Sequence, residues 1–324
     1  MIAIESSIIF IKIFRLMHHL IEVLGLSKIY GRRKLPAVED VSFTIKEGEI
    51  LGFAGLNGAG KTTTINCMSG VLLPSRGHIL VDGMDIVKDK PKASRNIGWV
   101  SEFPTFEQNV KPTELLRYFA GFYKLSNHES DQRITDVLIS VGLDGAVDKR
   151  LRDFSQGMKK RFGLASAMIS DPQNYLLDEI LNGLDPKGVH YVKSMALEFK
   201  KTGKSVLLST HILGILEDIS DRIAIIHQGR LKDVISRENF RKLGKPVINL
   251  KPNVIDETLI KLLEPYGTPV VNGDLISITD VLGSENIAQE MNSAVVKAGY
   301  TISYLSVDGS SLEQYFLELT GAIT

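Results

Sequence analysis

The stretch that decides the fold is ILGFAGLNGAGKTT, residues 50–63. Gly55, Gly60, Lys61 and Thr62 match the pattern G-x-x-x-x-G-K-[ST], which is typical of P-loops. The apolar run 50–54 predicts a buried strand, and a helix is expected to follow from Lys61. Glycines let the backbone approach phosphate groups, and the positive end of the following helix adds to the attraction. We therefore predict a nucleotide-phosphate site, with Lys61 on the β- and γ-phosphates and the Thr62 hydroxyl on Mg²⁺.

The composition of the whole chain narrows the class of protein. The 324 residues predict two domains, and the formal net charge of zero argues against a dedicated nucleic-acid binder. The single cysteine, Cys67, excludes an internal disulfide or a cysteine-based metal site and fits a cytosolic setting. No run approaches the ~20 apolar residues that cross a bilayer. Residues 1–19 are expected to be a poorly ordered extension, with Met17 as a possible initiator and a membrane-surface helix as the alternative.

Short apolar runs alternate with amphipathic segments from residue 20 to residue 242. We expect strands at 21–30, 41–45, 77–83, 95–102, 175–177, 205–208 and 222–227, and helices at 113–124, 133–141, 156–169 and 187–200. Several strands end in polar residues, among them Asp178, Glu179 and His211. This alternation predicts an α/β fold with a parallel sheet, whose ligands bind beyond the carboxyl ends of the strands. The first strand, 21–30, is expected at a sheet edge.

Several further motifs occur in an order that resembles the ATP-binding subunit of ABC transporters, from Leu20 to about Lys242. GLNGAGKTT resembles Walker A, NYLLDE resembles Walker B, FSQGM stands at the signature motif and NGLDP resembles the D-loop. Glu102 takes the Q-loop position and His211 that of the switch histidine. The resemblance implies a P-loop NTPase with a helical subdomain at about 103–170, ATP and Mg²⁺ as cofactors, and in-line phosphoryl transfer to water.

The resemblance also implies a role for each motif residue. Glu179 would be the general base, and His211 would donate a hydrogen bond to the γ-phosphate. Mg²⁺ would be held by Thr62, Glu102 and Asp178. The nucleotide would contact Tyr30, whose ring would stack on adenine, and Gly55, Asn57, Gly58, Gly60, Lys61, Thr62 and Thr63. Ser155, Gly157 and Asp185 would contact the nucleotide bound by a second subunit.

The partners follow from the same resemblance. One P-loop and one signature motif imply a head-to-tail homodimer or heterodimer that closes on two ATP molecules. A separate transmembrane permease would dock on the helical insertion and the loop 103–112, which places the chain on the inner face of the cell membrane. SLEQYFLELTG, residues 311–321, resembles the end of ATPases that export drugs, lipids or polysaccharides. The alternatives are a soluble ABC ATPase with a non-transport partner and a nucleotide-gated module with little turnover.

Departures from the usual sequence at two motifs lead to expectations of their own. Gln156 and Met158 replace a glycine and a glutamine of the signature, so the backbone at 156 must avoid glycine-only angles. Ile180 and Leu181 replace the usual Pro-Thr, which could loosen the turn that aims Glu179 and slow hydrolysis.

After a linker at 242–246, residues 246–324 show the order βαββαβα. This order predicts a small ferredoxin-like α+β accessory domain. A regulatory or dimer-supporting role is one hypothesis for it, and a packing role is the other.

Overall fold

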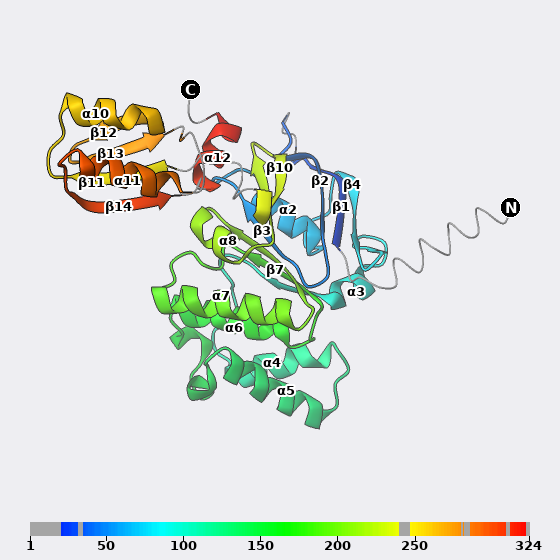
Figure 1. Ribbon diagram of the computed structural model, residues 1–324. Coiled ribbons are helices and arrows are strands. Elements are labelled where there is room, and N and C mark those ends of the chain that lie inside the picture. Colours follow the sequence, from blue (N-terminus) through cyan, green and yellow to red (C-terminus); the bar gives the residue numbers. More distant parts are fainter. Residues whose placement is uncertain are drawn as a thin grey trace, which may run out of the picture. The chain divides into compact units, whose positions relative to one another are not determined.

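The computed structural model describes residues 21–31, 35–239, 247–279, 281, 286–308 and 312–321 (Figure 1). The chain divides into two compact units, residues 1–235 and residues 236–324. The predicted N-terminal extension, including Met17, and the predicted linker 242–246 lie outside the described residues. None of the described helices is both long enough and apolar enough to cross a membrane.

The first unit is built on a six-stranded sheet with β3 near its centre. The strand order is β10-β9-β3-β8-β7-β6, with bounds Arg230–Ser236, Arg222–His227, Ile50–Ala54, Ser205–Thr210, Asn174–Asp178 and Ile97–Val100. β3 pairs in parallel with β8 and β9, and β7 pairs in parallel with β6 and β8. All residues of β3 and β7 are buried, as expected for strands covered on both faces. The predicted parallel sheet is confirmed, and its carboxyl edge brings the P-loop beside Asp178.

A second sheet of the same unit is antiparallel. Its order is β2-β1-β4-β5, with bounds Val38–Ile45, Ile21–Lys28, Arg76–Val81 and Met84–Asp85. β1 pairs with β2 on one side and with β4 on the other, so the predicted edge position of this strand is wrong. Alternation along a strand reports which of its faces is buried, and it does not report how many neighbours the strand has. The core between the sheets includes Val23, Phe43, Phe53 and residues of helix α2, Lys61–Met68.

The remaining helices of this unit are α3 Lys90–Ala93, α4 Pro112–Gly121, α5 Asn127–Ser140, α6 Gln156–Met168, α7 Pro186–Lys201 and α8 Leu213–Ile219. Of these helices, α4, α6 and α7 lie close to their predicted positions, α5 begins six residues before its predicted start, and α3 and α8 were not predicted. α4, α5 and α6 pack against one another, and α5 buries Ile134, Val137 and Leu138 on the predicted apolar face. Ser155 caps α6, because its Oγ accepts a hydrogen bond of 3.2 Å from the Met158 N–H.

The second unit contains one antiparallel sheet in the order β12-β13-β11-β14. The chain order is β11 Val247–Pro252, α10 Glu257–Leu263, β12 Thr268–Asn272, β13 Leu275–Thr279, α11 Ile287–Lys297, β14 Ile302–Asp308 and α12 Leu312–Thr320. The order βαββαβ with the first strand between the third and the fourth is the ferredoxin-like arrangement. Leu250, Ile276 and Met291 lie in its core and are fully buried.

Candidate active site

Two glycines show why the P-loop has its sequence. Gly60 has φ +108°, a conformation that side-chain-bearing residues rarely adopt. A Cβ on Gly55 would lie 2.6 Å from the backbone oxygen of Ile226, which belongs to the neighbouring strand β9. The loop between β3 and α2 therefore needs glycine at both positions to keep its backbone close to the site.

The P-loop lines a cavity of about 280 Å³ at the carboxyl edge of the sheet. The predicted residues that line it are Asn57, Gly58, Gly60, Lys61, Thr62, Thr63, Glu102 and Glu179. Ala37 and Leu56 complete the lining. Residues from three separate motifs, Walker A, the Q-loop position and Walker B, are thus brought to one cavity, which is large enough to receive phosphate groups.

Lys61 is buried and holds its ammonium group at the carboxyl edge of the sheet. Its Nζ donates a hydrogen bond of 2.6 Å to the carbonyl oxygen of Gly55. The same Nζ lies 2.9 Å from Glu179 Oε1, where both side chains are about 95% buried. This contact is an ion pair that lacks the alignment of a hydrogen bond. A phosphate that binds Lys61 must therefore compete with Glu179 for the cation.

The two acidic residues at the end of β7 point to one site because the backbone turns at Glu179. Glu179 has φ +46°, in the left-handed region, so the strand ends there and the two carboxylates no longer alternate. The Glu179 N–H donates a 2.9 Å hydrogen bond to Ser209 Oγ, and Ser209 Oγ donates one of 2.7 Å to Asp178 Oδ1. One hydroxyl therefore fixes both acidic residues.

Ser209 is a site residue that the sequence interpretation missed. It faces Asp178 in the parallel register of β7 and β8, two residues before His211. The available signal was a polar residue at the carboxyl end of a buried strand, the same signal that identified His211.

His211 lies at the other side of the Glu179 carboxylate. Its Nδ1 is 3.2 Å from Glu179 Oε2, and its side chain is 42% exposed. Glu179 thus lies between Lys61 and His211, so the lysine, the carboxylate and the histidine form one chain of contacts at the cavity.

The oxygen atoms near Asp178 fit a divalent cation. Asp178 is fully buried, and its Oδ2 has no hydrogen-bond partner. Burial raises the pKa of the Asp178 carboxyl, the hydroxyls of Ser209 and Thr62 lower it, and the nearby charges of Glu179 and Glu102 raise it again. A cation at Oδ2 would stabilise the charged carboxylate and so offset the unfavourable effect of its burial. Across the described residues, no three His, Cys, Asp or Glu side chains form a self-sufficient metal site, which suits an ion held mainly by phosphates and water.

Tyr30 lies at the rim of this site. Its hydroxyl is 3.2 Å from Thr63 Oγ1, and Lys28 Nζ lies 5.5 Å from the centre of its ring. The ring is about one-third exposed and does not line the cavity of the P-loop. The structure therefore places Tyr30 beside the P-loop with part of its surface exposed.

The signature and D-loop residues line a different cavity, of about 530 Å³. Ser155, Gly157 and Asp185 all border it, together with Arg161 and Tyr191. None of the P-loop residues borders this second cavity. Gln156 begins helix α6 without a positive φ, as its side chain requires. The P-loop residues and the signature and D-loop residues thus line two separate cavities of one chain.

Comparison with known proteins places the chain in a family. The family model described as ABC transporter matches residues 38–182. The bacitracin transport ATP-binding protein BcrA of Bacillus licheniformis is 31% identical over 312 residues, which cover 95% of this chain and 99% of that protein. The Nod factor export ATP-binding protein I of Rhizobium meliloti is 32% identical, over 93% of this chain and 88% of that protein.

The similar solved structures come from the same family as these relatives. An ATP-binding subunit of an ABC transporter has a TM-score of 0.64 and 34% identity, and the match covers 69% of this chain and 92% of that chain. A dimeric ATP-binding cassette in a post-hydrolysis state, bound to ADP and Pi, has a TM-score of 0.60 at 22% identity and supports the fold alone. The chain belongs to the ATP-binding subunits of ABC transporters, a family that binds and hydrolyses ATP. Such subunits dimerise, work with transmembrane permeases and associate with the membrane peripherally.

Proposed function

We propose that this chain hydrolyses Mg²⁺-ATP at the interface of a head-to-tail dimer and thereby powers export through a separate membrane permease. The observation that supports the dimer is the separation of the two cavities. The P-loop cavity contains the base and the lysine, whereas Ser155 and Asp185 border the other cavity. In a head-to-tail pair, each P-loop faces the signature of the other subunit, so two complete sites form by symmetry.

The proposed chemistry follows from the contacts of Glu179. Lys61 exchanges the Glu179 carboxylate for the β- and γ-phosphates, which leaves Glu179 free to accept a proton from the attacking water. His211, 3.2 Å from the same carboxylate, lies where its ring can donate to the γ-phosphate. Asp178, Thr62 and Glu102 would hold Mg²⁺, which supplies charge neutralisation on the phosphates. Tyr30 would stack on the adenine.

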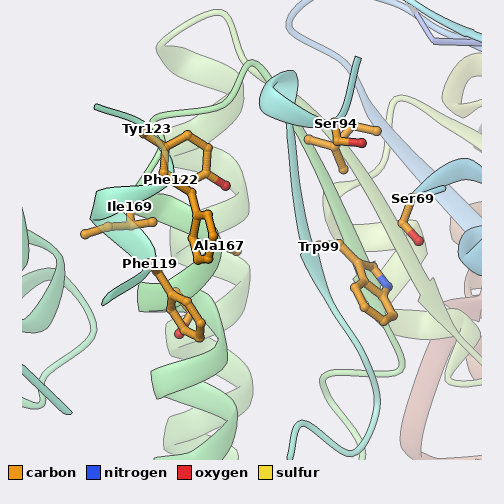
Figure 2. Close-up of a pocket in the computed structure, with 10 residues that line it drawn as sticks. Ser69, Ser94, Trp99, Phe119, Phe122, Tyr123, Ala167 and Ile169 are labelled. Atoms are coloured by element: carbon orange, nitrogen blue, oxygen red, sulfur yellow. The ribbon is translucent and has the colours of Figure 1, made fainter. Parts of the chain in front are cut away.

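A groove on the first unit suits a helix of the permease. It has a volume of about 290 Å³ and is lined on one side by Phe119, Phe122 and Tyr123 and on the other by Trp99 and Ser94 (Figure 2). Phe122 is 60% exposed, so the groove offers aromatic surface to a partner. The relatives named for bacitracin transport and Nod factor export support a transporter as that partner. We place this groove on the cytoplasmic side of the membrane.

The test of the dimer is complementation between two inactive variants. Lys61→Ala removes the phosphate-binding ammonium, and Ser155→Arg blocks the signature half-site. In a mixed head-to-tail dimer, one site has both its parts intact. Random mixing in equal amounts should therefore restore about a quarter of the parent's sites, because half of the dimers are mixed and each has one working site.

The control for this experiment is a mixture in which both variants carry the same defect. Two Lys61-defective chains, for example Lys61→Ala with Lys61→Met, should remain inactive when mixed. No recovery from Lys61→Ala plus Ser155→Arg, under conditions where the parent chain hydrolyses ATP, would contradict the head-to-tail arrangement.

A further inference from the structure

Lys160 is a buried lysine on α6 whose ammonium group donates three hydrogen bonds, all to backbone carbonyls. The residue is 6% exposed, and its Nζ donates to the carbonyl oxygens of Glu179 at 3.3 Å, Ile180 at 3.1 Å and Asn182 at 2.5 Å. An ammonium group has three N–H donors, so each finds an acceptor. The side chain thus spans from the second turn of the signature helix to the turn that follows Walker B.

The turn 179–182 needs an external support. Glu179 adopts a left-handed conformation at φ +46°, which costs free energy in a residue with a side chain. No proline follows Glu179, since Ile180 and Leu181 occupy the next positions and are buried. Within the turn, the Asn182 N–H donates to the Glu179 carbonyl at 3.1 Å. Lys160 adds a second donor to the Glu179 carbonyl and supplies donors to the carbonyls of Ile180 and Asn182.

The cost of burying Lys160 indicates a role beyond packing. Burial lowers the pKa of its ammonium group, while the charges of Glu102 and Glu179 act in the opposite direction. An apolar side chain would fill the same space without the loss of hydration. The buried ammonium group differs from an apolar side chain in its three hydrogen bonds, and all three are made to the turn 179–182.

The same turn is also linked to the Q-loop position. Asn182 Nδ2 donates a hydrogen bond of 3.1 Å to Glu102 Oε1. The backbone carbonyl of Asn182 therefore accepts a hydrogen bond from Lys160, and its side chain donates one to Glu102. Lys160, the turn and Glu102 form one connected polar network that borders the P-loop cavity.

We propose that Lys160 is a positioning residue for ATP hydrolysis, which holds the turn 179–182 so that the Glu179 carboxylate faces the γ-phosphate. This inference rests on the proposed role of Glu179 as the base. α6 then serves two nucleotides: Ser155 at its N-terminus serves the one bound by the partner subunit, and Lys160 serves the one bound by its own chain.

The test compares Lys160→Met with Lys159→Met in the full chain. Methionine keeps an unbranched side chain and removes all three donors, and Lys159 is the adjacent, partly exposed residue on the same helix. We expect Lys160→Met to lower kcat about tenfold or more, because small displacements of a catalytic group are costly, while KM for ATP changes less than about twofold. Lys160→Gln, which keeps two donors, should recover part of kcat, and Lys159→Met should match the parent.

A double-mutant cycle separates positioning from general stability. Single-turnover hydrolysis is measured in Glu179→Gln with and without Lys160→Met. If Lys160 acts through the Glu179 carboxylate, the second change should have little effect where that carboxylate is already absent. An equal factor in both backgrounds, an unchanged kcat in Lys160→Met, or failure of both Lys160→Met and Lys160→Gln to fold would each overturn the inference. Parent-like hydrolysis by Glu179→Gln alone would instead overturn the assignment of the base.

Discussion

Replacing Ser209 by alanine should damage both stability and hydrolysis. Ser209 is fully buried, and its Oγ accepts from the Glu179 N–H at 2.9 Å and donates to Asp178 Oδ1 at 2.7 Å. Alanine leaves a buried amide and a second buried carboxylate oxygen without partners. At about 1–2 kcal/mol for each unsatisfied group, the free energy of unfolding should fall by about 2–4 kcal/mol.

Ser220 provides a matched control for this substitution. It is also fully buried, but its Oγ has no hydrogen-bond partner. Ser220→Ala removes a hydroxyl that was desolvated without compensation, so stability should stay within about 0.5 kcal/mol of the parent or rise. The two variants lose the same atom from the same first unit, and they differ in the bonds that the atom makes.

The assay is urea unfolding followed by tryptophan fluorescence. The chain has a single tryptophan, Trp99, which lies in β6 beside β7. Its emission therefore reports the sheet that carries Asp178, without a signal from the second unit. Steady-state hydrolysis at saturating ATP is measured in parallel, and Ser209→Ala should lower kcat through the displaced Glu179 backbone. Equal unfolding midpoints for Ser209→Ala and Ser220→Ala would refute the reasoning.

Three other predictions concern separate parts of the chain. Gly55→Ala should destabilise the first unit by about 1–3 kcal/mol and weaken ATP binding, since its Cβ would lie 2.6 Å from a backbone oxygen; parent-like ATP affinity by calorimetry would contradict this. Burial raises the pKa of the Cys67 thiol to about 11, so iodoacetamide at pH 8 should label the chain only in denaturant, and rapid native labelling would be the opposing result. The Leu259 N–H, followed by the Tyr300 hydroxyl, lowers the pKa of Asp256, the cap of α10. A carboxyl group whose pKa is lower in the folded state stabilises the fold at pH values above its unfolded pKa, and this stabilisation is lost as the pH falls through the folded pKa. Asp256→Ala should therefore lower the stability of the second unit at pH 7 and much less near pH 3. An equal loss of stability at both pH values would contradict this prediction.

Much of the nucleotide site could be predicted because its residues lie in local motifs. The P-loop, the acidic pair and His211 each follow a buried strand, and parallel strands bring their carboxyl ends to one edge. Ser155 precedes the predicted helix 156–169 as a capping residue type, and the structure shows Ser155 and Asp185 each capping the helix that follows. For these positions, neighbours along the chain decide most of the geometry.

The parts that escaped prediction depend on contacts between distant residues. Lys160 resembles any other lysine of an amphipathic helix, and only the packing of α6 against the turn after β7 shows why it is buried. The expectation that Ile180 and Leu181 loosen this turn rests on the sequence alone; in the structure both residues are buried, and the turn receives three hydrogen bonds from Lys160. Whether these two residues slow hydrolysis stays a prediction. The interior position of β1 depends on β4, about fifty residues further along the chain.

The ion pair between Lys61 and Glu179 has a consequence for selectivity among anions. A cation already matched by a carboxylate at 2.9 Å is a poor trap for a stray inorganic phosphate or sulfate, which must displace Glu179 and has few other groups to bind. In the function that we propose, a nucleoside triphosphate would reach the same lysine while it also contacts the rest of the loop and the rim beside Tyr30. We therefore expect the ion pair to weaken the binding of small anions more than the binding of a nucleoside triphosphate, which would contact more of the loop.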